Sequence, residues 1–207
     1  MSPVTTRRID VVLFDGFELL DVFGPVQLWS VLGDAVDVAL VGPARGPVRS
    51  SQGTRVEVTT AYADAPPPDV VLVPGGAGTR ALVHDAGFLA WLARWSADAS
   101  LVTSVCTGSA VLAAAGLLDG YRATSNKYAF GWASTHGDDV AWVPQARWVE
   151  DRDRWTSSGV AAGMDMTVAL IRHLFGPQAA EAAATFTELD VHRDPGWDPF
   201  ASRHGLV

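Results

Sequence analysis

The sequence predicts an α/β protein built on a mostly parallel β-sheet, and two features indicate this fold class. Apolar segments of strand length, such as 9–14, 36–41 and 69–73, alternate with segments of helical periodicity. That alternation is typical of a sheet whose parallel strands are connected by helices. The strand-like segments end at glycine or proline turns, or run directly into a helix, as 101–105 does.

In the first half of the chain, turn residues separate the expected strands. These strands are 9–14, 36–41, 55–59 and 69–73, with helices at 21–32 and 88–97. Strands 9–14, 36–41 and 69–73 are mostly apolar, as buried strands are, and each is closed by a glycine or proline turn. Segment 55–59 instead alternates apolar and polar residues, so we expect one of its faces to meet solvent.

The second half is less regular after the strand that leads to Cys106. We expect a short strand at 121–124, a short aromatic-rich helix at 128–136, a hairpin of 146–150 with 154–157, helices at 162–175 and 178–189, and a loop-like tail at 190–207. The hairpin is indicated by the charged turn between its two segments. Helix 162–175 carries apolar residues at helical spacing and stops at Gly176-Pro177.

Composition limits the possible classes of protein. The 207 residues, of which 48% are hydrophobic, suit a well-filled core, and we expect a single domain over residues 1–207. A net charge of −8 argues against a nucleic-acid surface. Met1 to Arg8 lacks the pattern of an export signal, and no apolar run approaches the ~20 residues that span a bilayer. We therefore expect a cytoplasmic protein without a membrane partner.

Cys106, the only cysteine, lies where a strand turns into a helix. Such a turn lifts the side chain above the sheet edge, and the unpaired N–H groups at the start of the helix favour thiolate. A lone cysteine next to valine and alanine can also be a small core residue. We favour the reactive alternative and expect a depressed thiol pKa. The lack of a second cysteine excludes an internal disulfide and fits a reducing compartment.

Several motifs together resemble the ThiJ/PfpI superfamily of the class I glutamine amidotransferase-like fold. They are Phe14-Asp15-Gly16, Val73-Pro74-Gly75-Gly76, the segment 103–109 around Cys106, Ala114 to Leu118, Tyr121 to Thr124 and Thr156 to Asp165. The Cys-Thr-Gly elbow, with an aspartate eight residues after Leu13, is most similar to the isonitrile (isocyanide) hydratase branch. The resemblance covers about residues 8–190. It implies a flavodoxin-like three-layer sandwich with a cysteine nucleophile elbow, and a homodimer.

The resemblance also implies the site residues. Cys106 is the nucleophile, Asp21 is its acid, and the N–H groups of Gly76 and Thr107 form an anion-stabilising hole. A carboxyl buried beside a thiolate has a raised pKa and can stay protonated, which agrees with that role. Each residue has a structural alternative: Asp21 as a helix N-cap, Gly75-Gly76 as a sharp turn, and Thr107 as an ordinary polar residue of the first helical turn.

Departures from the family pattern concern the substrate. Thr107 follows the cysteine where the protease-like and deglycase-like branches have histidine, so a Cys-His peptidase mechanism lacks a base. Hydratases of this type tend to have Thr-Thr-His-Trp after Arg-Ala, whereas this chain has Asn126 and Lys127 at the last two of those positions. We expect Gly75, Asn126 and Lys127 to line the substrate pocket, although Lys127 is equally consistent with a solvated residue at the start of a helix.

The resemblance thus implies a cofactor-independent lyase that hydrates an isocyanide to an N-substituted formamide, and the local chemistry suits a thioimidate on Cys106. The five histidines of the chain lack ligand spacing, and Gly75 to Gly78 lacks the spacing of a nucleotide-binding loop, so we expect no metal and no organic cofactor. The expected partner is a small electrophilic substrate. Three alternatives remain open: a glyoxalase or deglycase acting on small α-oxoaldehydes, a redox or stress sensor, and a regulatory ligand-binding module of the kind that precedes AraC-type DNA-binding segments.

Overall fold

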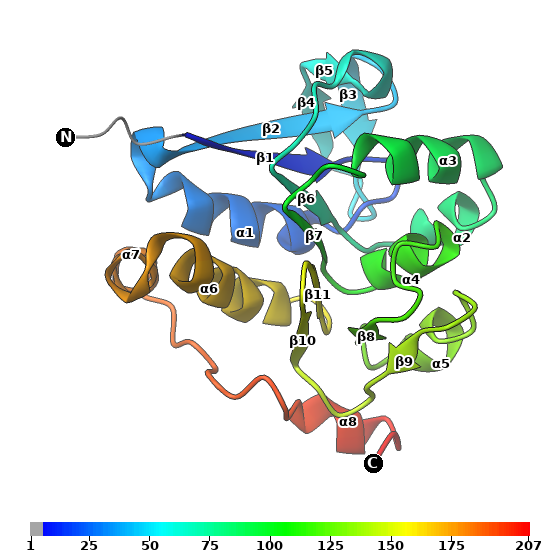
Figure 1. The fold of residues 1–207 in the computed structure, drawn as a ribbon, viewed down its shortest axis with the longest axis vertical. Coiled ribbons are helices and arrows are strands. Elements are labelled where there is room, and N and C mark those ends of the chain that lie inside the picture. Colours follow the sequence, from blue (N-terminus) through cyan, green and yellow to red (C-terminus); the bar gives the residue numbers. More distant parts are fainter. Residues whose placement is uncertain (1–5) are drawn as a thin grey trace.

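The computed structural model describes residues 6–207, which fold as helices packed on a central β-sheet (Figure 1). The strands are β1 Arg7–Val12, β2 Val36–Gly42, β3 Gly46–Arg49, β4 Arg55–Val58, β5 Thr60–Ala61, β6 Val70–Val73, β7 Leu101–Ser104, β8 Arg122–Ala123, β9 Ala141–Trp142, β10 Trp148–Asp151 and β11 Arg154–Ser157. The α-helices are α1 Leu19–Ser30, α2 Thr79–Leu82, α3 Ala86–Trp95, α4 Gly108–Ala114, α5 Phe130–Ala133, α6 Ala162–Phe175, α7 Pro177–Phe186 and α8 Pro199–Arg203. Residues 1–5 of the expected domain lie outside the described residues.

Within residues 6–207 the central sheet has seven strands in the order β10-β11-β7-β6-β1-β2-β5. All neighbouring strands run parallel except the hairpin of β10 and β11. The sheet therefore confirms the predicted mostly parallel class. Because β1, β6 and β7 are parallel neighbours, the loops after them meet at one edge of the sheet, which is where open α/β sheets place their sites.

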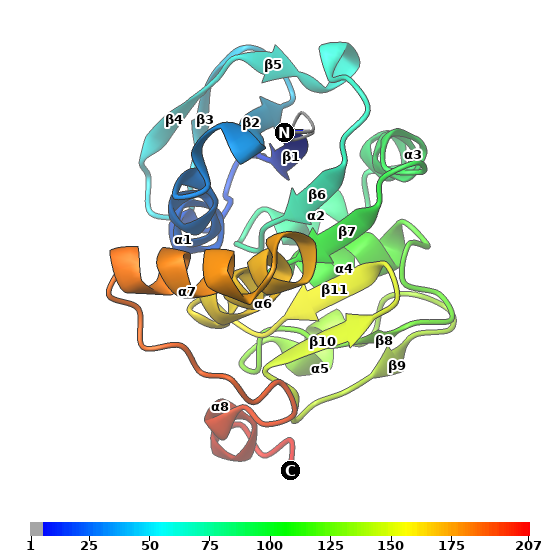
Figure 2. The ribbon, with the colours of Figure 1, turned by 60° about the vertical axis from the view of Figure 1, so that its left-hand side comes forward.

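Helices cover both faces of the sheet (Figure 2). Helices α1, α6 and α7 lie on one face, and α2 to α5 lie on the other. All residues of β6 and β7 are buried as a result. Burial on both faces explains why the strand residues before each site loop are mostly apolar, and it confirms the three-layer arrangement.

The tail differs from the expected loop because residues 199–203 form helix α8. Asp198 caps this helix, since its carboxylate accepts the Phe200 N–H at 2.9 Å, and Pro199 occupies the first helical position. This is a standard start signal for a helix. Upstream, the tail is fixed to the segment before β10, where Arg147 N–H donates to the Pro195 carbonyl at 2.8 Å.

Several further elements were not anticipated, namely the strands β3, β5 and β9 and the helix α2. Strand β3 pairs with β4 outside the central sheet, and α2 is a single helical turn directly after the glycine loop 75–78. Helix α2 is too short for its periodicity to be visible in the sequence. Across the part of the chain that the structure describes, no helix has the length and apolar character needed to cross a bilayer.

Candidate active site

Cys106 occupies the tight turn between β7 and α4. Its φ of 59° lies in the left-handed region, which is uncommon for a residue with a side chain and is often found at functional sites. The turn is held from two sides. The Cys106 N–H donates to the carbonyls of Ser157 and Ser158, both at 3.2 Å, and its carbonyl accepts the hydroxyls of Ser109 at 3.1 Å and Ser125 at 3.0 Å.

Asp21 lies in the first turn of α1 and is fully buried. Its Oδ2 accepts the N–H of Gly75 at 2.8 Å, so the residue contacts the β6–α2 loop and does not cap its own helix. Its Oδ1 is buried and has no hydrogen-bond partner within residues 6–207. Burial raises the pKa of Asp21 to about 8; the Gly75 N–H opposes this shift and the charge of Glu18 adds to it. The carboxyl is therefore mostly protonated at neutral pH.

Burial also raises the pKa of the Cys106 thiol, and the charge of Asp21 raises it further. The backbone N–H and the hydroxyl of Thr107 oppose the shift but do not outweigh it. The expectation of a depressed thiol pKa is therefore wrong for the resting site. Cys106 is only 7% exposed, and both this burial and the neighbouring carboxyl raise the thiol pKa. The dipole of α4, a helix of seven residues, lowers the thiol pKa but is outweighed.

The glycine loop packs against the elbow without room for side chains. A Cβ on Gly75 would lie 2.6 Å from the Thr107 nitrogen and 2.8 Å from the Cys106 Cβ. Gly76 has a φ of 123° and donates its N–H to the Thr107 hydroxyl at 3.1 Å, which also accepts the Thr79 hydroxyl at 3.1 Å. In this conformation the Thr107 amide acts on the sulfur, whereas the Gly76 amide is engaged by the Thr107 side chain.

Asn126 and Lys127 occupy different surroundings. Asn126 packs against Gly159, which directly follows the carbonyls that hold Cys106, and its Oδ1 accepts the Ala129 N–H at 3.0 Å. Lys127 is 4% exposed and donates from Nζ to the Thr124 hydroxyl at 2.8 Å and to the Ala146 carbonyl. Its burial lowers the pKa of its ammonium to about 8. The structure thus gathers Cys106, Asp21 and the glycine loop, brings Asn126 to their edge, and directs the Lys127 amine to other partners.

Two charged residues near the elbow were missed by sequence reasoning. Glu18 adds to the rise in the pKa of both Asp21 and Cys106, and its carboxylate is hydrogen-bonded to Gln52. Arg80 stacks its guanidinium on Trp132, 3.2 Å from the ring centroid. Burial lowers the pKa of this guanidinium, and a thiolate on Cys106 raises it. The only available signal was the proximity of each to a motif: Glu18 precedes Asp21 by three residues, and Arg80 follows the glycine loop by two.

In the described part of the chain, no three histidine, cysteine, aspartate or glutamate side chains gather closely enough to hold a metal ion. The groups that meet at the elbow are a thiol and a protonated carboxyl, with a backbone amide directed at the sulfur. These are the components of nucleophilic and general acid catalysis.

Comparison with known proteins places this arrangement in a family. The model of the DJ-1/PfpI family matches residues 7–173. The chain is 40% identical to the isonitrile hydratase of Pseudomonas putida over 174 residues, which make up 84% of this chain and 75% of that enzyme. It is 34% identical to the HTH-type transcriptional regulator CdhR of Pseudomonas aeruginosa over 65% of this chain and 40% of the regulator. The crystal structure of a ThiJ/PfpI family protein from Pseudomonas syringae superposes with a TM-score of 0.83 at 33% identity, covering 90% of this chain and 76% of that one. The chain therefore belongs to the DJ-1/PfpI family.

Proposed function

We propose that the protein is a cysteine-dependent lyase that hydrates an isocyanide to the corresponding N-substituted formamide. The observation that carries this proposal is the fully buried Asp21 carboxyl, with a pKa of about 8, next to the Cys106 thiol. Hydration requires a proton on the isocyanide carbon, and an acid that keeps its proton at neutral pH can supply it. The 40% identity to an isonitrile hydratase supports this choice of substrate.

In the first step Asp21 donates its proton to the terminal carbon of the isocyanide, and Cys106 Sγ attacks the same carbon. A C–S bond and a C–H bond form, and the thiol proton passes to the Asp21 carboxylate. The product is a thioimidate on Cys106 with Asp21 again protonated. The N–H of Thr107 stabilises negative charge on the sulfur as the proton leaves, which requires a donor ~3 Å from that charge.

In the second step water attacks the thioimidate carbon. Asp21 protonates the nitrogen and takes a proton from the water, which leaves a tetrahedral adduct with a hydroxyl group on the carbon. The C–S bond then breaks, the hydroxyl proton returns to sulfur through Asp21, and the formamide leaves. One isocyanide and one water are consumed, and Cys106 and Asp21 regain their initial states.

The glycine loop and its neighbours hold the reacting groups in place. Gly75 fixes the Asp21 carboxyl through its N–H. When the Thr107 hydroxyl turns toward the adduct, it releases the Gly76 N–H, which then becomes a second donor to the adduct. Asn126, at the edge of the elbow, contacts the substituent on the isocyanide nitrogen. Lys127 keeps its hydrogen bonds to Thr124 and Ala146 and acts on the pocket only by fixing the loop that carries Asn126.

An aryl isocyanide incubated with the purified protein tests this function, with formamide followed by mass spectrometry. We expect product from the wild type and none above background from Cys106→Ser. Asp21→Asn keeps an acceptor for the Gly75 N–H but cannot exchange a proton, so turnover should fall by about 100-fold or more. Asp85→Asn is the matched control because Asp85 only caps α3, by accepting the Phe88 N–H at 3.0 Å.

The same assay distinguishes the alternatives. Cys106-dependent lactate from methylglyoxal without formamide would assign the protein to the glyoxalase type. Inertness towards both substrates, together with reversible oxidation of Cys106, would indicate a sensor. Full turnover by Asp21→Asn would refute the acid role that the proposal gives to Asp21.

A further inference from the structure

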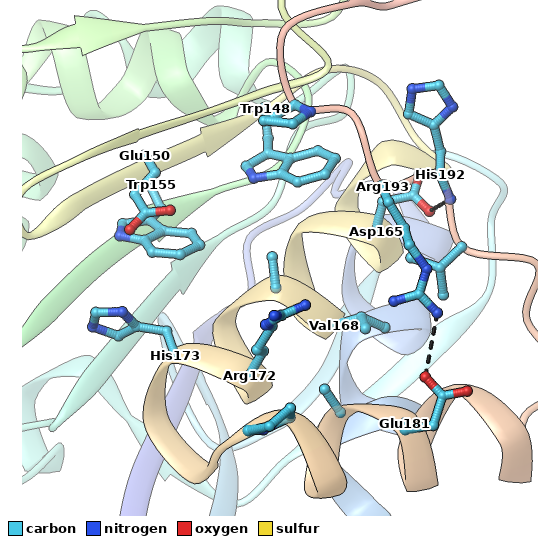
Figure 3. A pocket seen from close by; sticks show the side chains of 15 residues that line it. Trp148, Glu150, Trp155, Asp165, Val168, Arg172, His173, Glu181, His192 and Arg193 are labelled. Carbon is cyan, nitrogen blue, oxygen red and sulfur yellow. Dashed lines mark hydrogen bonds and ion pairs between the residues drawn. The ribbon is translucent and has the colours of Figure 1, made fainter.

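A cavity of about 500 Å³ lies along α6, lined on that helix by residues from Asp165 to His173 (Figure 3). None of the residues of the Cys106 elbow lines it. Its walls come from the hairpin β10–β11, from α6 and the start of α7, and from the extended segment 191–195. Gly163 at the start of α6 packs on Val105 beside the elbow, whereas Arg172 in the cavity is nine residues, or ~13 Å, further along the helix. The volume is in the range of ~300–1,000 Å³ that small-molecule sites occupy.

Apolar side chains, two of them aromatic, form part of the lining of this cavity beside its charged groups. Trp148 and Trp155, which are 6% and 1% exposed, line it from the hairpin. Val168 and Ala180, each 5% exposed, line it from the two helices. In Figure 3 the two indole rings lie on the hairpin side of the cavity, and Val168 and Arg172 rise from the helix below them. Flat apolar walls of this kind favour a ligand with a flat apolar body.

The charges around the cavity leave one cation near its centre without a partner. Arg193 is paired with Glu181 at 3.2 Å, and Asp165 is paired with Arg147 at 2.6 Å. Arg172 forms no ion pair or hydrogen bond from its side chain within residues 6–207.

Other charged and polar groups on the cavity wall also influence whether an anionic or a cationic ligand binds. Glu150 is also unpaired in the described chain. It is the last residue but one of β10 and lies beside Trp155 at the edge of the cavity (Figure 3). His173 and His192 add possible donors, and α7 begins at Pro177 on the cavity wall, so the positive end of its dipole lies there. The unpaired charges on the cavity wall are thus the Arg172 guanidinium and the Glu150 carboxylate, and the histidines and the start of α7 add donors near Arg172.

We propose that this cavity is a binding site for a small aromatic carboxylate. The ring of the ligand packs between the indoles of Trp148 and Trp155 and the side chains of Val168 and Ala180. Its carboxylate accepts two parallel hydrogen bonds from the Arg172 guanidinium, because the planar guanidinium and the planar carboxylate match in geometry. The site does not depend on the reaction proposed for Cys106, because its lining residues are separate from the elbow.

Three probes that share one ring system test the proposal by calorimetric titration: indole-3-acetate, indole-3-acetamide and tryptamine. We expect indole-3-acetate to bind at least tenfold more tightly than the neutral amide, and tryptamine to bind no better than the amide. Tighter binding of tryptamine would show that Glu150 governs the site and would overturn the proposal. Failure of all three probes to bind would also overturn it.

Two matched arginine variants locate the carboxylate. Arg172→Gln should weaken the binding of indole-3-acetate at least tenfold, to the affinity of the amide. The affinity for indole-3-acetamide should not change. Arg94→Gln is the control because Arg94 is likewise an exposed arginine in the last turn of a helix, here α3. Equal losses in both variants, or none in Arg172→Gln, would refute the assignment.

A third variant separates this site from the elbow. Ala169 lines the cavity and is only partly buried, so Ala169→Phe fills the space that the ring would take. This variant should lose indole-3-acetate binding, whereas Cys106→Ser should keep it. Loss of binding in Cys106→Ser would place the ligand at the elbow instead. Far-ultraviolet circular dichroism of each variant provides the check on folding.

Discussion

Cys106 and Asp21 form a buried pair in which burial raises the pKa of both groups. Groups this close titrate as a pair and not as independent sites. Since both keep their protons at neutral pH, the proposed mechanism forms the nucleophile only when the substrate carbon accepts a proton from Asp21. A permanently ionised thiolate is not required, and a buried, protonated thiol is also less exposed to oxidants.

Turnover of an isocyanide should decrease as the pH rises through about 8. The pKa of Asp21 is raised from its ordinary 3.8 to about 8, and the proposed mechanism uses the protonated form. The ratio kcat/KM should therefore be constant below this value and fall above it. A mechanism that starts from thiolate would show the opposite slope, so the pH profile of kcat/KM distinguishes the two.

The Cys106 thiol should titrate above the ordinary value of ~8.5, as followed by thiolate absorbance in the ultraviolet. Because Cys106 is the only cysteine, a Cys106→Ser blank isolates its signal from that of the tyrosines. Asp21→Asn should lower the midpoint, because it removes the repulsion by the carboxylate and leaves the burial in place. A wild-type midpoint below ~8.5 would contradict this prediction, because it would mean that the N–H groups at the start of α4 lower the thiol pKa more than burial raises it.

At the scale of elements, the elbow depends on the close approach of α4 to the end of β6. A Cβ on Gly108 would lie 2.1 Å from the Val73 carbonyl oxygen and 2.8 Å from that of Pro74. Both are backbone atoms of a buried strand end, so they cannot move aside as a flexible side chain would. The glycine at this position is thus required by packing and not by its backbone dihedral angles.

Gly108→Ala should reduce the free energy of unfolding by about 1–3 kcal/mol, despite the higher helix propensity of alanine. Gly131→Ala is the control, since Gly131 lies in helix α5 and its Cβ would meet no atom within 4 Å. The control should be neutral or stabilising by up to about 1 kcal/mol. Urea unfolding of the two variants measures both values, and equal behaviour would show that α4 can shift away from β6.

Across the whole molecule, buried charges attach the C-terminal segment to the sheet. The Arg147 guanidinium is 2.6 Å from Asp165 Oδ2 and 3.7 Å from Asp198 Oδ2. The other oxygen of Asp165 accepts the His192 N–H at 2.9 Å. These contacts fix residues 191–195, which form one wall of the cavity along α6, so the integrity of that cavity depends on Arg147.

Arg147→Ala should destabilise the protein by about 3–5 kcal/mol, because the buried carboxylates of Asp165 and Asp198 lose the guanidinium that is paired with them. Arg45→Ala is the comparison, since its pairing with Asp64 is exposed and worth about 0–1 kcal/mol. Chemical unfolding gives both energies. Limited proteolysis should also cut the segment after residue 189 faster in Arg147→Ala, and unchanged cleavage would contradict this role.

A further prediction at this scale is a homodimer, which the family resemblance implies. Leu20 and Phe23, on either side of Asp21 in α1, are 41% and 39% exposed and provide apolar surface for a second copy. Light scattering at micromolar concentration should give about twice the chain mass of 21.9 kDa. A mass near 21.9 kDa would contradict the prediction.

The sequence by itself determined the features that depend on local pattern. Alternating apolar and helical segments predicted the parallel sheet, and the small residues after Cys106 predicted the elbow. Helix 162–175 was predicted with its observed bounds because its apolar spacing and its Gly176-Pro177 stop are both local signals. The Asp198-Pro199 start of α8 was an equally local signal, and it was overlooked.

Only the tertiary structure decided the features that depend on burial and on contacts between distant residues. The bond from Gly75 to Asp21 joins positions 54 residues apart, and it replaces the helix cap that local sequence favours. The rise in the Cys106 pKa depends on how deeply packing buries the sulfur, and the partners of Lys127 include the carbonyl of Ala146, 19 residues away. Solvent exclusion and long-range proximity arise only when the chain has folded, so they leave no periodic trace in the sequence.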